Sequence, residues 1–156
     1  MDSSLTATAA SALPVLLVWA GAVDIFMRVI PNRVVLLLAA CFGFFAAAAW
    51  MPFAEIAAHI ACACAVLACG FWLFSRRLIG GGDAKLLAVA ALWFGFDNLL
   101  PFLAATALAG GVLSLAYLAL NAARAGLGRA SEPTIPYGAA VAVGALAILP
   151  DWLALL

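Results

Sequence analysis

Six apolar runs divide the chain, and residues that interrupt helices separate them. The runs cover residues 8–27, 34–51, 56–75, 84–96, 99–120 and 135–149. Pro31 follows the first run, Pro52 follows the second, and the pair Asp97 and Asn98 separates the fourth from the fifth. Because a helix of about 20 apolar residues crosses the hydrocarbon core of a bilayer, the pattern predicts an all-α fold, a bundle of six transmembrane helices.

The fourth run is shorter than a spanning helix requires, and the distribution of charge decides how it is counted. With six spans, all seven Lys and Arg residues fall on one side of the membrane, whereas merging the fourth and fifth runs would split them. An excess of basic residues marks the cytoplasmic side. The sequence therefore predicts both termini outside (N-out, C-out) and three basic connections in the cytoplasm. The longest of these is residues 121–134.

Composition excludes a soluble domain. Of the residues, 69% are apolar and only 9% are charged, whereas a typical soluble chain is about half apolar and about a quarter charged. Six spans leave only short loops, so we expect residues 1–156 to form one integral domain surrounded by lipid in the cytoplasmic (inner) membrane. Residues 1–27 contain no Lys or Arg, so we expect the first span to be retained rather than removed as a signal peptide. Seven basic residues balance seven acidic ones, which argues against a nucleic-acid partner.

Two aspartates lie at the basic edge of the membrane, where a charge is costly unless it is paired or hydrated. Asp24 lies one helical turn before Arg28, and Asp83 follows Gly80-Gly81-Gly82. Each has a structural alternative to a functional role. Asp24 is spaced to form an i, i+4 ion pair with Arg28, and Asp83 is placed to cap the fourth helix after a flexible turn.

Two aspartates held within a few ångströms cannot both ionise, so they share a proton. One then acts as a base on water while the other polarises a carbonyl. This is the chemistry of aspartic proteases, and it makes Asp24 and Asp83 the candidate catalytic pair. Such a pair needs no metal and no cofactor, and we expect neither.

Other residues that bear reactive groups do not form a competing site. Cys62, Cys64 and Cys69 lie in one run, but Cys64 points away from the face that the other two share, so three thiolates would not converge on zinc. The one histidine, His59, lies one turn from Glu55. We interpret these two side chains as an interfacial pair.

Three segments resemble motifs of a known family. They are DIFMRVIPN at residues 24–32, GGGDAKL at 80–86 and IPYGAA at 135–140. In this order they resemble the motifs of the prepilin peptidases, also called type IV leader peptidases, which are membrane aspartic proteases marked by a GxGD motif. Besides the two aspartates, the matching residues are Pro31, Asn32, Gly80, Gly82, Lys85, Pro136, Tyr137 and Gly138.

The resemblance implies that Asp24 and Asp83 are catalytic. It also implies a prepilin substrate, with a short basic leader in the cytoplasm and a hydrophobic helix in the membrane, cut at the junction between them. Longer members carry a methyltransferase domain with paired Cys-x-x-Cys motifs, which are absent here, so methyltransferase activity is not expected. The short form resembles the peptidases of tight-adherence (Flp-type) pilus systems, although archaeal preflagellin peptidases are also short.

Other hypotheses are open for the same residues. A presenilin-like protease would cut inside the bilayer, a small transporter would use Asp24 and Asp83 to relay protons, and a scaffold for a pilus machine would need neither. Lys85 fits either a group that stabilises a carboxylate or a basic anchor at the membrane edge. Pro136, Tyr137 and Gly138 fit either support for the mouth of the site or the start of a helix.

Overall fold

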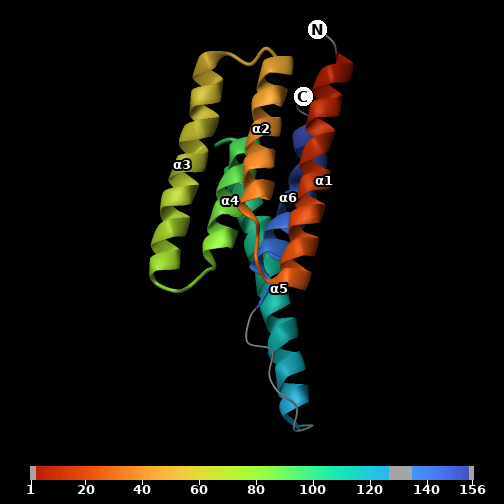
Figure 1. Cartoon of the computed structure of the whole chain (residues 1–156), viewed down its shortest axis with the longest axis vertical. Helices are drawn as coiled ribbons and strands as arrows, with labels where there is room; N and C mark the ends of the chain where they lie inside the picture. The colour runs from red at the N-terminus through yellow and green to blue at the C-terminus, as the bar shows by residue number, and fades with distance from the viewer. Residues whose placement is uncertain (1–2, 127–134, 155–156) are drawn as a thin grey trace.

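In the computed structural model, which describes residues 3–126 and 135–154, the described residues form six α-helices, and short turns join the first five in succession (Figure 1). The helices run alternately up and down, so the start of α1 and the end of α6 lie at the same end of the bundle. They are α1 (Ser3–Met27), α2 (Asn32–Ala48), α3 (Phe53–Ser75), α4 (Gly81–Phe94), α5 (Leu99–Gly126) and α6 (Tyr137–Leu153). The all-α prediction is confirmed.

Three of these helices are long and apolar enough to cross a membrane. They are α1 from Thr8 onward, α3 and α5. Helices α2 and α6 are also apolar but shorter, with 17 residues each, and α4 has 14. The helices that can span identify a membrane protein, in agreement with the composition.

Most helix boundaries differ from the predicted runs by a few residues, and two of the differences concern Asp83 and a predicted loop. Helix α4 begins at Gly81, three residues before the predicted run, so Asp83 lies inside its first turn. Helix α5 continues to Gly126, so the predicted loop is wrong for residues 121–126. That segment, NAARAG, contains three alanines, and alanine has the highest intrinsic helix propensity. Residues 127–134, the rest of that predicted loop, lie outside the described residues.

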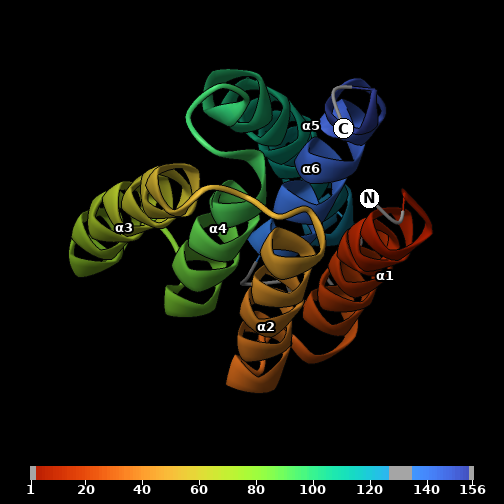
Figure 2. The ribbon, with the colours of Figure 1, turned by 90° about the horizontal axis from the view of Figure 1, so that it is seen from above.

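The short helix α4 lies at the centre of the bundle. It packs against α2, α3, α5 and α6 (Figure 2), and most of its residues from Ala84 to Phe94 are buried. A helix enclosed in this way is expected to be apolar all round. Near its end, Trp93 donates a hydrogen bond of 3.1 Å to the carbonyl of Leu38 and packs edge-on against Trp152. This packing fixes the position of α4 along the bundle. It therefore also fixes the position of Asp83, which lies at the opposite end of α4.

Helix α6 lies between α1 and α5 and approaches both closely. A β-carbon at Gly21 of α1 would lie 3.0 Å from the β-carbon of Ala142, and Gly144 of α6 packs directly on the backbone of Thr106. Small residues allow such close approach where lipid supplies no hydrophobic drive for association. As a result, the start of α6 lies beside the last turns of α1.

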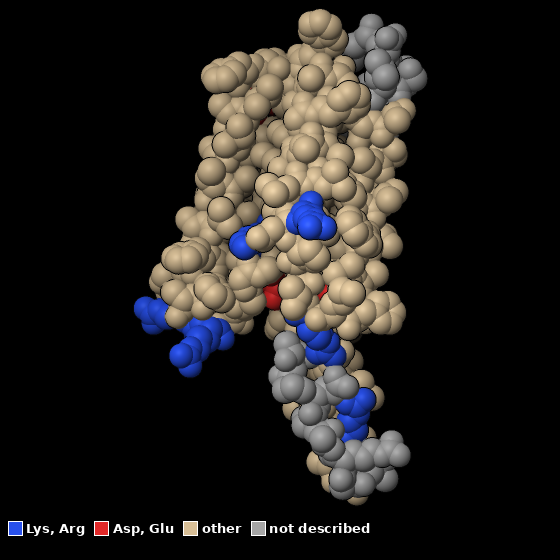
Figure 3. Space-filling view, viewed as in Figure 1, with Lys and Arg blue, Asp and Glu red and all other residues tan. Residues whose placement is uncertain are grey.

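The described basic residues gather at one end of the bundle. They flank the α1–α2 turn, flank the α3–α4 turn, or lie near the end of α5. Figure 3 shows Lys and Arg from near the middle of this face to its lower part, with Asp or Glu atoms visible among them. These basic residues are Arg28, Arg33, Arg76, Arg77, Lys85 and Arg124. Arg129 lies outside the described residues.

His59 is not paired with Glu55, so the interpretation of an interfacial pair is wrong. Its Nδ1 lies 2.7 Å from the carbonyl oxygen of Leu92, and its ring stacks on Phe42 at 5.4 Å between centroids. Leu92 lies in the last turn of α4, where carbonyls have no partner within the helix. The histidine therefore ties α3 to α4.

Candidate active site

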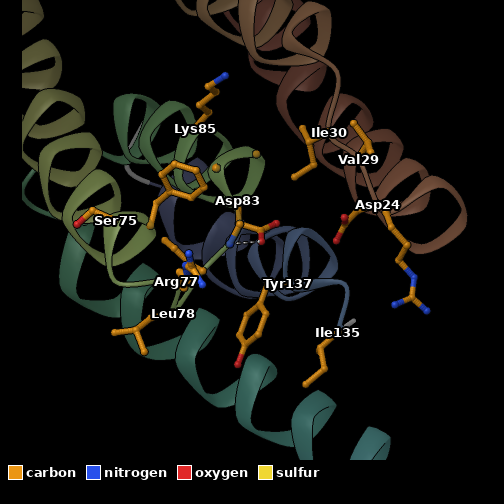
Figure 4. Close-up of a pocket in the computed structure, with 16 residues that line it drawn as sticks. Asp24, Val29, Ile30, Ser75, Arg77, Leu78, Asp83, Lys85, Ile135 and Tyr137 are labelled. Carbon is orange, nitrogen blue, oxygen red and sulfur yellow. Dashed lines mark hydrogen bonds between the residues drawn. The ribbon is translucent and has the colours of Figure 1, made fainter. Parts of the chain in front are cut away.

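Asp24 and Asp83 line the same pocket, at the end of the bundle that carries the basic residues. The pocket has a volume of about 920 Å³ and lies between the α1–α2 turn and the α3–α4 turn. Figure 4 shows the two carboxylates turned toward each other across it. Two side chains that are 59 positions apart in the sequence are thus brought together by the packing of α1, α4 and α6.

Asp24 lies in the last turn of α1 and is buried, with 5% of its surface exposed. The backbone N–H of Ala139 donates a hydrogen bond of 3.3 Å to its Oδ2, and the amide of Gly138 also interacts with the carboxylate. Both amides belong to the first turn of α6, where N–H groups lack helical partners and the helix dipole is positive. The start of α6 therefore supplies the polar surroundings that this buried carboxylate needs.

Asp83 lies in the first turn of α4 and is half-buried. Its Oδ2 accepts a hydrogen bond of 3.2 Å from the backbone N–H of Gly80. Gly80 is the N-cap residue and Asp83 the third residue of the helix, so the hypothesis of Asp83 as the N-cap is wrong by three positions. From this third position the carboxylate stabilises the start of the helix and also interacts electrostatically with Asp24.

Two glycines let the backbone approach the carboxylates, and a third packs against Ile30. A β-carbon at Gly138 would stand 2.9 Å from Cγ and Oδ2 of Asp24, and one at Gly80 would stand 2.6 Å from Oδ2 of Asp83. At Gly82 the β-carbon would lie 3.2 Å from the β-carbon of Ile30. Two of the three similar motifs therefore contact a carboxylate through a glycine, and the GxGD segment also contacts Ile30.

Ile30 is a residue of the site that the sequence motifs did not single out. This buried residue lies beside both Gly82 and Gly138, and so lies between the GxGD segment that carries Asp83 and the start of α6, whose amides bind Asp24. Its position directly before Pro31, inside the first of the three similar segments, was the available signal. A large apolar side chain at this point fills the space between the starts of α4 and α6.

Lys85 and Asn32 are two more of the matching residues, and they contact each other. Lys85 Nζ donates a hydrogen bond of 3.0 Å to Asn32 Oδ1. Asn32 is the first residue of α2, preceded by Pro31 as the N-cap. The lysine therefore connects the α1–α2 turn to α4.

Tyr137 and Pro136 begin α6, with Pro136 as its N-cap. Tyr137 lines the pocket, but its hydroxyl lies 3.2 Å from Ser114 Oγ of α5 and points away from the carboxylates (Figure 4). Its role in this structure is to fix the start of α6 on α5. Through that contact it positions the amides of Gly138 and Ala139.

Arg28 also joins the site to α5. Helix α1 ends at Met27, and Arg28 adopts a positive φ of 56°. Its guanidinium donates a hydrogen bond of 3.3 Å to the Tyr117 hydroxyl and lies 5.5 Å from the ring centroid. Tyr117 was not identified from the sequence, because a lone interfacial tyrosine in an apolar run carries no specific signal.

Comparison with protein families identifies the chain. The model of the type IV leader peptidase family matches residues 11–115, which include both aspartates and the GxGD segment. The chain belongs to this family. It is therefore a membrane peptidase of the class that acts on prepilins, as the resemblance of the three motifs implied. Pro136, Tyr137 and Gly138 lie outside the matched segment. Comparisons with curated proteins and with solved structures found no match.

Proposed function

We propose that this leader peptidase is an aspartic endopeptidase that removes the basic leader of Flp-type prepilins at the cytoplasmic edge of the membrane. Asp24 and Asp83 are its catalytic residues. One observation carries the proposal: the two carboxylates, from α1 and α4, face each other in one pocket at the basic end of the bundle.

The chemistry follows from the pair sharing one proton. The ionised carboxylate takes a proton from a water molecule, whose oxygen attacks the carbonyl carbon of the scissile peptide. The protonated carboxylate gives its proton to the carbonyl oxygen, which yields a tetrahedral diol. When the C–N bond breaks, the first aspartate gives its proton to the leaving nitrogen and a diol hydroxyl returns a proton to the second. The pair ends in its starting state, without a metal or a cofactor.

Backbone amides hold both carboxylates in place for this reaction. Asp24 interacts with the amides of Gly138 and Ala139, and Asp83 with that of Gly80. Catalytic groups that are already oriented lose less entropy at the transition state. The hydrogen bonds therefore support a role for the two aspartates beyond capping and ion pairing.

We further propose six spans with both termini outside. Helices α2 and α6, with 17 residues each, rise about 26 Å, close to the hydrocarbon thickness of about 30 Å. Helix α4 is enclosed by other helices, so its 14 residues need not match the bilayer on their own. The basic end of the bundle then faces the cytoplasm, which places cleavage at the cytoplasmic edge.

The test is processing of prepilins in cells. The protein is co-expressed with each prepilin encoded in the same genome, and the mature amino terminus is read by mass spectrometry. We expect removal of the basic leader directly before the hydrophobic helix by the wild-type protein but not by the Asp24→Asn variant. A cut within the helix would favour a presenilin-like reaction, and unprocessed prepilin in every pairing would refute the proposal.

A further inference from the structure

A long apolar groove lies between α2 and α3, outside the active-site pocket. Two cavities of about 710 and 290 Å³ share Ile60 and Leu92 among their lining residues, so they adjoin. Figure 2 shows α2 and α3 on either side of α4, and Ala88, Val89 and Leu92 of α4 line the floor. We call this surface the α2–α3 groove and define it by Ala39, Gly43 and Ala47 of α2, Ile60 and Cys64 of α3, and Leu92 of α4.

The α2 side of the groove has small side chains at Ala39, Gly43 and Ala47, whereas the α3 side includes the larger Ile60 and Leu67. Positions 39, 43 and 47 recur every four residues on α2, and positions 60, 64 and 67 follow the same helical repeat on α3. A β-carbon added at Gly43 would meet nothing within 4 Å. Small residues on a membrane helix allow another helix to approach closely. Side chains of this chain leave the groove open on its α2 side, so another helix could pack closely there.

The length of the groove also suits a transmembrane helix. Its lining extends along α2 from Val35 to Ala47, a rise of about 18 Å. That length covers more than half of a hydrocarbon core of about 30 Å. The occupant is therefore expected to be an apolar segment lying parallel to the bundle.

The groove is continuous with the active site. Lys85 lines both the groove and the pocket, and it lies two residues from Asp83 on α4. A helix lying in the groove would end beside Asp83, and the peptide just beyond its end would enter the pocket. A lipid acyl chain also suits apolar walls, but it has no polypeptide to present to the carboxylates.

We propose that the α2–α3 groove binds the apolar transmembrane helix of the prepilin substrate, so that the peptide at its cytoplasmic end passes Lys85 and reaches Asp24 and Asp83. The inference rests on the proposed function, since it takes these carboxylates as the place of cleavage. Beyond the proposed function, the groove would select substrates that have a membrane helix. It would also set the distance between that helix and the cleaved peptide bond.

Two glycines provide a matched test in which a large side chain blocks the groove or, as a control, a surface outside it. Gly43 in the groove and Gly111 on α5 are both exposed, and a β-carbon at either meets nothing within 4 Å. Gly43→Trp and Gly111→Trp are assayed on a full-length prepilin and on a peptide that holds only the leader and the first residues after the cut. We expect Gly43→Trp to cut the full-length prepilin at least tenfold more slowly than wild type and the peptide at the wild-type rate. Gly111→Trp should match wild type on both.

Two native cysteines provide an independent test by cross-linking. Cys64 and Cys69 are both exposed on α3, and only Cys64 lines the groove. Variants that keep one of them, with the other cysteines replaced by Ser and with Asp24→Asn to prevent turnover, are oxidised with prepilins that carry single cysteines along the apolar helix. We expect disulfides to Cys64 at helical intervals along the prepilin, and none to Cys69.

The outcomes distinguish failure of the groove proposal from failure of the proposed peptidase function. Wild-type rates for Gly43→Trp on the full-length prepilin, or equal cross-linking of Cys64 and Cys69, would overturn the proposal. A disulfide between Cys64 residues of two copies, without a prepilin adduct, would overturn it in favour of a self-interface. If the wild-type protein cleaves neither substrate, the proposed function fails, while cross-linking still decides whether the groove holds the helix.

Discussion

Gly138 lies so close to Asp24 that the carboxylate occupies the space that a β-carbon at position 138 would need. That carbon would stand 2.9 Å from both Cγ and Oδ2 of the aspartate and 2.7 Å from Cδ1 of Ile30. The two residues are 114 positions apart. Through this contact the segment 135–140 forms part of the site. It does so with its backbone and not with a reactive side chain.

Substitution of Gly138 by Ala should therefore lower the cleavage rate strongly. The added methyl must displace the Asp24 carboxylate or the start of α6, and a displacement of about 1 Å can cost on the order of 100-fold in rate. The rate is measured on detergent-solubilised protein with a prepilin substrate. Gly111→Ala, at a position with nothing within 4 Å, is the control and should match wild type. Full activity of Gly138→Ala would show that the close contact is not needed for catalysis.

Asp24→Asn and Asp83→Asn should each remove activity while the protein still accumulates in the membrane. Each variant keeps the shape of the side chain but leaves half of the shared-proton pair, and loss of general acid–base catalysis costs about 10²- to 10⁴-fold. Processing of a co-expressed prepilin is read by mass spectrometry. Asp97→Asn is the matched control, because Asp97 is exposed in the turn between α4 and α5. Normal processing by either dyad variant would rule out the mechanism.

The glycines of the GxGD segment should differ in their sensitivity. A β-carbon at Gly80 would lie 2.6 Å from Oδ2 of Asp83, whereas one at Gly82 would lie 3.2 Å from the β-carbon of Ile30. The first contact forces the carboxylate to move, while the second requires a shift of only a few tenths of an ångström. We expect Gly80→Ala to reduce the cleavage rate more than Gly82→Ala, at equal membrane yield. The reverse order would argue against the present placement of Asp83.

The hydrogen bond between Lys85 and Asn32 should appear as coupling in a double-mutant cycle. Asn32→Ala and Lys85→Met each remove the bond, so the double variant should lose little more activity than the worse single variant. A bond of this kind contributes about 1 kcal/mol, which corresponds to a several-fold change in rate. Independent, additive losses would instead indicate that Lys85 acts directly on the substrate.

Topology can be tested by cysteine accessibility in a variant without native cysteines. A cysteine at Leu78, in the α3–α4 turn, should react with a membrane-impermeant reagent only from the cytoplasmic side. A cysteine at Asp97, in the α4–α5 turn, should react only from outside. The expectation follows from the basic residues Arg76 and Arg77 beside Leu78 and from the tendency of such residues to remain in the cytoplasm. Labelling of the Leu78→Cys variant from outside would refute the proposed orientation.

Much of the fold could be predicted because the membrane imposes rules that act on short segments. Apolar runs must be helical, since no water satisfies their backbone groups within lipid, and the runs at 8–27 and 56–75 correspond to α1 and α3. The end of α5 could not be predicted in this way. Its last turns extend beyond the apolar run, where helix propensity rather than hydropathy decides.

The sequence by itself determined the helical fold, and it identified the two aspartates whose charge the bilayer edge makes costly. Both properties depend on residue type and on spacing along the chain. Only the tertiary structure decided what those aspartates contact: the amides that begin α6 for Asp24, and the amide of Gly80 for Asp83. It also decided that His59 binds the Leu92 carbonyl rather than Glu55, and that α2 and α3 leave a groove above α4. These contacts join segments distant in the chain, and they depend on how the helices pack, which no local pattern of apolar and polar residues specifies.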